Sequence, residues 1–119
     1  MPMPFGKKIE TQFKLVTDIN NVNEFVSGTS NIGEIDTIPS KLVIKFGPPM
    51  SGDGHKVSGE YVFENKDGRP ITLYDWKWTT LYDESNPFTS VGFWMLDKPI
   101  QFSVGCINKS DFYSFETWI

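Results

Sequence analysis

The stretch that decides the fold is KVSGEYVFENKDGRPITLYDWKW, residues 56–78. It contains two runs rich in β-branched and aromatic residues, 56–64 and 71–78, joined by residues 65–70. The connection holds Asp67-Gly68, a pair favoured in tight turns because glycine adopts a positive φ without strain. Two such runs around such a turn predict a β-hairpin. We therefore expect antiparallel pairing at the centre of the fold.

Further strands are expected on both sides of this hairpin. Apolar and polar residues alternate at 8–16, at 41–46 and again from Ile100 to Val104, and a period of two is typical of half-buried strands. In the middle run, Leu42, Ile44 and Phe46 are expected to face inward. Residues 27–40 are rich in Ser, Gly, Asn and Thr and predict a loop.

Two short helices complete the expected architecture. Asp18 is placed to cap a helix through Ile19, Val22, Phe25 and Val26, with Gly28 ending it, and Ser110 is placed to cap a C-terminal helix. Residues 79–99 have no regular pattern, and their apolar run 93–96 fits a helical turn or a strand. The expected fold class is α+β, a mainly antiparallel β-sheet with one or two short helices, including the C-terminal one.

Length and composition restrict the class of protein. The chain has 119 residues, which suits one compact domain, and its 39% hydrophobic and 22% charged residues are ordinary globular usage. There is no apolar run of the roughly 20 residues needed to cross a bilayer, and the first residues do not resemble a secretory signal. The single cysteine, Cys106, favours a reducing, cytoplasmic compartment. A net charge of −4 argues against a surface for duplex nucleic acid.

Aromatic residues make up 15% of the chain, an unusual share for its length. Buried rings contribute large apolar areas, so a small domain can use them to build its core. Exposed rings would instead form a ligand site or a protein interface. Composition leaves both interpretations open.

Residues that could perform catalysis are few. The only histidine is His55, and Cys106 follows an alternating run where a cysteine is usually an inert apolar side chain. The carboxylates of Asp75, Asp83 and Glu84 are close in sequence, but such residues usually serve turns and solvation. We expect no catalytic residue, no metal site and no cofactor, because ligand clusters and nucleotide-binding fingerprints are missing from the sequence.

Two segments are candidate ligand contacts. Glycines in the run Gly52, Asp53, Gly54, His55 and Lys56 would let backbone amides approach an anion, with Lys56 adding positive charge. The alternative is a connection that only turns the chain. Rings on the second strand of the hairpin could stack on a planar base or support a packed helix; they belong to Tyr74, Trp76 and Trp78.

The pattern GDG-KV-EYVFE-DG-TLYDWK, which begins at Gly52 and ends at Lys77, resembles small accessory proteins of bacteriophages and other large DNA viruses. The similar region covers about residues 46–83. The resemblance implies a viral protein made in the cytoplasm of an infected cell, and it transfers no catalytic residue.

Three functions follow as expectations. The first is a non-catalytic accessory protein that counters host defence by sequestering a small nucleotide-derived signal, with a homo-oligomer as the expected assembly. The second is an inhibitor that binds a host protein through an aromatic patch. The third is a small carboxylate-dependent enzyme acting on a nucleotide. Binding is favoured over catalysis because candidate contacts outnumber candidate acids, bases and nucleophiles.

Overall fold

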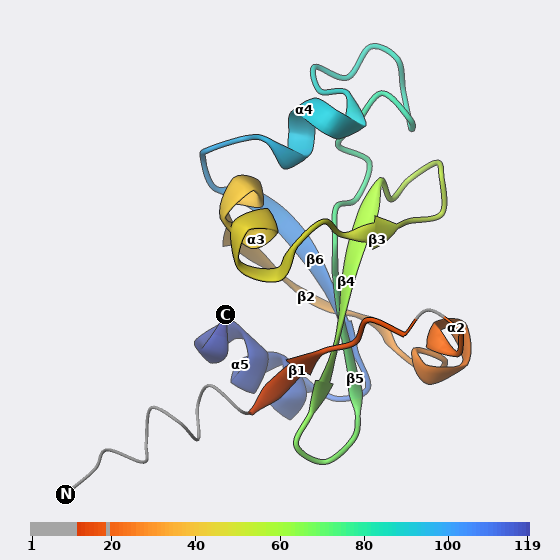
Figure 1. Ribbon diagram of the computed structural model, residues 1–119, viewed down its shortest axis with the longest axis vertical. Coiled ribbons are helices and arrows are strands. Elements are labelled where there is room, and N and C mark those ends of the chain that lie inside the picture. Colours follow the sequence, from red (N-terminus) through yellow and green to blue (C-terminus); the bar gives the residue numbers. More distant parts are fainter. Residues whose placement is uncertain (1–11, 19) are drawn as a thin grey trace, which may run out of the picture. The chain divides into compact units, whose positions relative to one another are not determined.

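The computed structural model describes residues 12–18 and 20–119, and it has the expected α+β architecture with a mainly antiparallel sheet (Figure 1). The strand order is β1-β4-β5-β6-β2, and β3 also pairs with β4. The strands are β1 (Phe13–Leu15), β2 (Ser30–Thr37), β3 (Met50–Ser51), β4 (Gly59–Asn65), β5 (Pro70–Tyr74) and β6 (Ile100–Cys106). The helices are α2 (Val22–Phe25), α3 (Pro39–Phe46), α4 (Ser90–Trp94) and α5 (Lys109–Trp118).

The central hairpin is confirmed as β4 and β5, with shorter strands than the sequence indicated. Its turn is built on Asn65, whose side-chain oxygen accepts hydrogen bonds from the amides of Asp67 (3.0 Å) and Arg69 (2.8 Å). Gly68 has φ +83°, the conformation for which a glycine is needed there. β5 ends at Tyr74, so residues 75–78 leave the sheet instead of continuing a strand.

The predicted strand over 41–46 is wrong, because residues 39–46 form helix α3. Pro39 occupies the start of the helix, where its fixed φ is favourable and its missing N–H costs nothing. Leu42 is buried but Ile44 is 85% exposed, so the inferred inward face does not exist. The same segment also fits a helical period through Pro39, Leu42, Val43 and Phe46.

The predicted loop over 27–40 is also wrong in its central part, which is strand β2. β2 lies at the end of the strand order, next to β6. An edge strand exposes much of its surface, so it can be polar, and Ile35 is the apolar residue of β2 that is buried. Polar composition therefore concealed this strand.

Helix caps differ from those expected. The carboxylate of Asp18 accepts a hydrogen bond from the amide of Asn20, and helix α2 begins after Asn21. Helix α5 is capped by Asn108, whose side chain accepts from the amide of Asp111.

The apolar run at 93–96 belongs in part to α4, and the predicted strand at Ile100–Val104 is confirmed within β6. Residues 8–11 and Ile19 lie outside the described residues, and the described part of the first predicted strand is confirmed over β1, residues 13–15.

The chain divides into two compact units. Among the described residues, the first comprises 12–18, 20–33, 62–72 and 104–119, and the second comprises 34–61 and 73–103. Aromatic rings form the core of each. In the first unit Phe115 lies 5.2 Å from Phe63 and 5.5 Å from Phe13 between ring centroids; in the second, Trp94 lies 5.8 Å from Tyr61. These rings have the packing role that composition allowed, and the single domain stays a prediction.

Candidate functional site

The predicted anion loop is closed by its own carboxylate. Asp53 accepts hydrogen bonds from the amides of His55 (2.8 Å) and Val57 (2.9 Å). Hydrogen bonds from the Val57 and His55 amides, in that order, hold the pKa of Asp53 below its ordinary value. Gly54 has φ +77°, which makes glycine the suitable residue at this turn. These two amides therefore serve the loop itself, and any anion must be bound mainly by side chains.

An exposed indole lies beside this loop in the second unit. Trp76 is 43% exposed, and the ammonium nitrogens of Lys56 and Lys77 lie 5.6 Å and 5.5 Å from its ring centroid. Lys77 also lies 5.1 Å from the ring of Tyr82, whose centroid is 5.2 Å from that of His55. We call these five residues the Trp76 cluster: His55, Lys56, Trp76, Lys77 and Tyr82.

Backbone contacts hold the cluster in place. The amide of Lys77 donates to the carbonyl of Lys56 at 2.7 Å, which joins the two lysines directly. The side-chain amide of Asn86 donates to the carbonyls of Lys77 (3.1 Å) and Thr79 (2.9 Å). The segment after β5 is therefore fixed in a defined path although it belongs to no strand.

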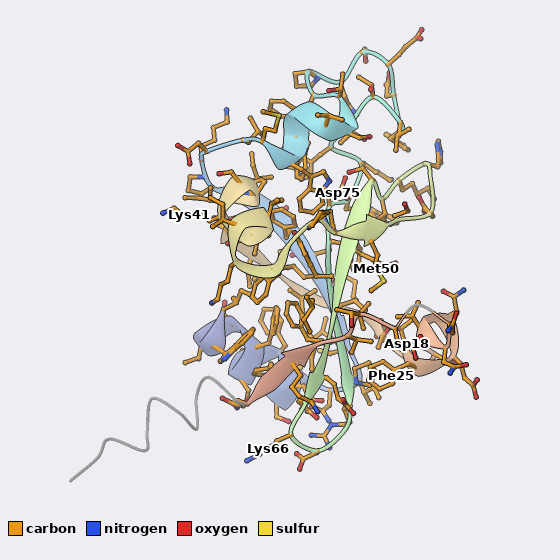
Figure 2. The ribbon with its side chains drawn as sticks, in the orientation of Figure 1. Asp18, Phe25, Lys41, Met50, Lys66 and Asp75 are labelled. Atoms are coloured by element: carbon orange, nitrogen blue, oxygen red, sulfur yellow. The ribbon has the colours of Figure 1, made fainter. Side chains whose placement is uncertain are left out.

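Asp75, labelled in Figure 2, anchors the same segment from inside. Its carboxylate is fully buried and accepts hydrogen bonds from the amides of Ser58 (2.8 Å) and Gly59 (3.0 Å) and from the Ser58 hydroxyl (2.8 Å). Trp94 donates its indole N–H to that hydroxyl at 3.0 Å. Burial raises the pKa of Asp75, and these hydrogen bonds oppose the rise. The residue is a structural anchor with no surface open to a ligand.

The other two predicted stacking residues have different surroundings. Tyr74 is half-buried, and its ring lies edge-on to Trp76 with centroids 6.2 Å apart. Burial, followed by the charges of Glu60 and Glu34, raises the pKa of the Tyr74 hydroxyl. Trp78 donates its indole N–H to the carbonyl of Gln101 at 2.9 Å. The structure thus brings Trp76 and Lys56 together, places Tyr74 beside them, and holds Trp78 against β6.

Lys77 and Tyr82 are cluster residues that sequence reasoning missed. Lys77 lies between two of the predicted rings, but its residue type gives no sign of its backbone conformation. Tyr82 comes from the segment without a regular pattern. The Asn86-Pro87 pair was the available signal that this segment turns back. In the structure, the side-chain amide of Asn86 donates to the carbonyl of Lys77 and so holds the segment there.

Cys106 lies in surroundings typical of a structural cysteine. Its side chain is fully buried in the first unit, and its thiol donates to the carbonyl of Asn108 at 3.3 Å. Burial, and then the charge of Asp111, raise the pKa of the Cys106 thiol. A thiol that stays protonated is a poor nucleophile.

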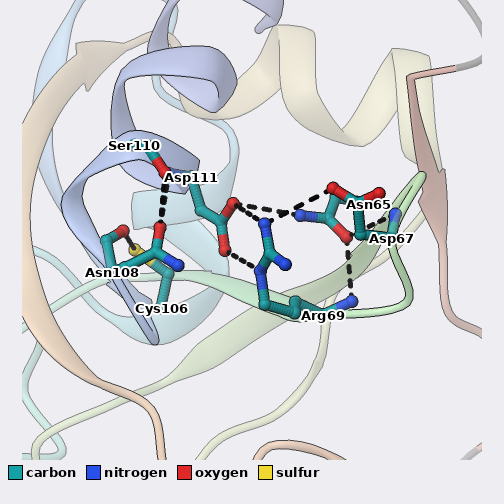
Figure 3. A network of polar contacts seen from close by, with 7 residues as sticks. All are labelled: Asn65, Asp67, Arg69, Cys106, Asn108, Ser110 and Asp111. Carbon is teal, nitrogen blue, oxygen red and sulfur yellow. Dashed lines mark hydrogen bonds and ion pairs between the residues drawn. The ribbon is translucent and has the colours of Figure 1, made fainter.

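The first unit also contains a polar network around Asp111 (Figure 3). Arg69 binds this buried carboxylate with two nitrogens, at 2.7 Å and 2.8 Å, and Asn65 donates to it at 3.1 Å. Together with Ser110 these residues line a polar cavity of about 160 Å³. Since the charges of Arg69 and Asp111 satisfy each other, the network fastens the hairpin turn to α5.

Nowhere in 12–18 and 20–119 do three or more His, Cys, Asp or Glu side chains converge in a way that could hold a metal ion. No helix in that part of the chain is both long and apolar enough to cross a bilayer.

Comparison of the chain with protein-family models and with curated proteins found no match.

Proposed function

We propose that this chain is a non-catalytic binding protein whose ligand is a small nucleotide-derived anion held at the Trp76 cluster. The observation that carries the proposal is one exposed indole with two ammonium groups within 6 Å of its centroid. An indole face suits a planar base, and ammonium groups suit phosphate oxygens. Both halves of a nucleotide therefore find a complementary group in one place.

Typical interaction energies favour stacking of a base on Trp76 over the lysine contacts that the ring already has. A cation–π contact at an exposed site is worth about 0.5–1 kcal/mol. Base stacking on an aromatic side chain is worth about 1–3 kcal/mol. A lysine displaced from the ring also gains a phosphate oxygen as its new partner. Exchange of one lysine contact for a stacked base is thus favourable.

Binding is a better account than catalysis. Asp75 and Cys106, two of the residues weighed for chemistry, are fully buried and hydrogen-bonded. Asp83 is exposed, but its carboxylate accepts from the amide (2.9 Å) and the hydroxyl (2.8 Å) of Ser85, which is turn geometry. The exposed groups of the Trp76 cluster are contact groups for a base and an anion.

The biological setting that we propose follows from the resemblance to viral accessory proteins. In that setting the chain would sequester a nucleotide-derived signal of the host cell and so blunt a defence response. This requires tight binding without turnover, which suits a surface that holds base and phosphate but performs no reaction. A homo-oligomer belongs to the same proposal.

A second candidate function is inhibition of a host protein through an aromatic patch. The observation that favours it is the exposure of Leu81, 43%, next to Tyr82 in the sequence. Aliphatic exposure beside exposed rings suits a protein surface better than a phosphate.

The test is a thermal-shift screen against AMP, ADP, ATP and cyclic nucleotides, followed by calorimetry with the nucleotide that stabilises most. Recovery of the nucleotide unchanged supports sequestration, and its consumption indicates an enzyme. No stabilisation by any nucleotide would contradict the proposal and favour a protein target.

Two variants localise the binding. Trp76→Ala should weaken affinity at least about fivefold, because it removes a stacking contact of at least about 1 kcal/mol. Tyr113→Ala is the matched control, because Tyr113 is an exposed ring, 58% exposed, on α5 of the first unit. Equal losses in both variants would remove Trp76 from the site.

A further inference from the structure

Lys77 has a backbone conformation that its residue type does not favour. Its φ is +66°, and among residues 12–18 and 20–119 it is the non-glycine residue with a positive φ. The left-handed region brings the Cβ of an L-residue close to the backbone, so a lysine there is strained where a glycine is not. Strain of this kind persists when surrounding contacts fix it, and it is common at functional sites.

Hydrogen bonds to both backbone polar groups of Lys77 fix this conformation. The Lys77 amide donates to Lys56 at 2.7 Å, and its carbonyl accepts from Asn86 at 3.1 Å. With the backbone held in this way, the side chain places its ammonium 5.5 Å from the Trp76 centroid and 5.1 Å from that of Tyr82. A glycine would satisfy the same backbone contacts without strain, but it would remove the ammonium.

We propose that Lys77 determines the ligand charge that the Trp76 cluster accepts, acting together with Lys56, and that its strained backbone is retained for this purpose. The inference rests on the proposed function. Two ammonium groups beside one indole give a stacked ligand two positive partners. Affinity should therefore rise with the negative charge of the ligand, in the order adenosine, AMP, ADP.

The experiment is a calorimetric titration of adenosine, AMP and ADP into wild type, Lys77→Gly, Lys77→Gln and Lys77→Arg. Lys77→Gly should keep or raise Tm, because it relieves the strain, yet it should lose about tenfold in affinity for ADP. Lys77→Gln keeps the backbone strain and most of the side chain but lacks the charge. It should therefore lose as much affinity for ADP as Lys77→Gly does. Lys77→Arg keeps the charge and should bind ADP within about threefold of wild type. Adenosine, which carries no phosphate, should bind the Lys77→Gly and Lys77→Gln variants at least as tightly as wild type, because no Lys77 contact then has to leave the ring.

The control is Lys66→Gln, since Lys66 is an exposed lysine of the hairpin turn in the first unit. It should bind ADP as wild type does. A purely structural role for Lys77 predicts the opposite pattern: a lower Tm for Lys77→Gly and equal losses for adenosine and ADP. That pattern, or equal affinity of wild type for adenosine and ADP, would overturn the inference and leave the site intact. If wild type binds none of the three ligands, both the proposed site and this inference fall.

Discussion

Replacement of Asp75 by alanine should destabilise the protein by about 2–3 kcal/mol. The substitution removes the acceptor of the Ser58 and Gly59 amides and of the Ser58 hydroxyl. A buried donor left without a partner costs about 1–3 kcal/mol. Gly59 is buried and should carry a large cost, whereas Ser58 is half-buried and water can replace part of its loss. Removal of a buried charge also recovers some desolvation energy. This gain offsets part of the cost of the unpaired donors and leaves a net destabilisation of about 2–3 kcal/mol.

Asp75→Asn is the matched variant, because it removes the charge and keeps the shape. Its side-chain oxygen can still accept from both amides, and its NH₂ group can donate to the Ser58 oxygen. The hydrogen bond lost is the one in which the Ser58 hydroxyl donates, so the cost should be about 1 kcal/mol.

Urea unfolding of the three proteins measures these differences, with the slope m compared to confirm that the unfolded states are alike. A shift of 2–3 kcal/mol in a chain of 119 residues should lower Tm by about 10 °C. The reasoning would be refuted if Asp75→Ala unfolded within about 0.5 kcal/mol of wild type. It would also be refuted if the asparagine variant were as unstable as the alanine variant.

Three further outcomes are expected. Val62→Pro removes an amide donor in the middle of β4 and should cost about 3 kcal/mol or more, so unchanged melting would contradict a central position for β4. Cys106→Ala should cost about 1 kcal/mol and leave nucleotide affinity unchanged by calorimetry; loss of affinity would contradict its structural role. The pKa of Asp75 is raised above its ordinary 3.8, so the folded protein binds this proton more tightly than the unfolded chain does. Stability of wild type relative to Asp75→Asn should therefore increase as the pH falls from about 7 towards 3.8, and urea unfolding across this range would contradict the assignment if the difference stayed constant.

The parts of the fold that could be predicted from the sequence are those specified locally. The hairpin follows from two β-rich runs and Asp67-Gly68, and β6 follows from a clean alternation. Helix α3 was misassigned because Leu42, Ile44 and Phe46 satisfy a period of two while the segment also satisfies the helical one. Strand β2 was missed because an edge position allows a polar composition that is otherwise typical of a loop.

The candidate site was predictable to a similar extent. Lys56 lies just before β4 and Trp76 just after β5, at the end of the hairpin opposite its turn, so the pairing of β4 with β5 explains why they meet. Lys77 could not be identified because its positive φ is fixed by two contacts that residue type does not reveal: its amide donates to the carbonyl of Lys56, and its carbonyl accepts from Asn86. The role of Asp53 was missed as well: its carboxylate accepts hydrogen bonds from loop amides two and four residues further along the chain, so these amides are not free to face an anion.

The most direct test of a nucleotide site at the Trp76 cluster is a two-dimensional ¹H–¹⁵N spectrum recorded while ADP is added. Trp78 and Trp94 donate their indole N–H groups to internal acceptors, whereas Trp76 presents an exposed ring. We expect the indole signal of Trp76, assigned with Trp76→Phe, and the amide signals of Lys56 and Lys77 to shift progressively until the site is saturated. A nucleotide site at the Trp76 cluster is contradicted if these signals stay fixed at millimolar ADP, or if the shifting signals lie instead around Arg69 and Asp111.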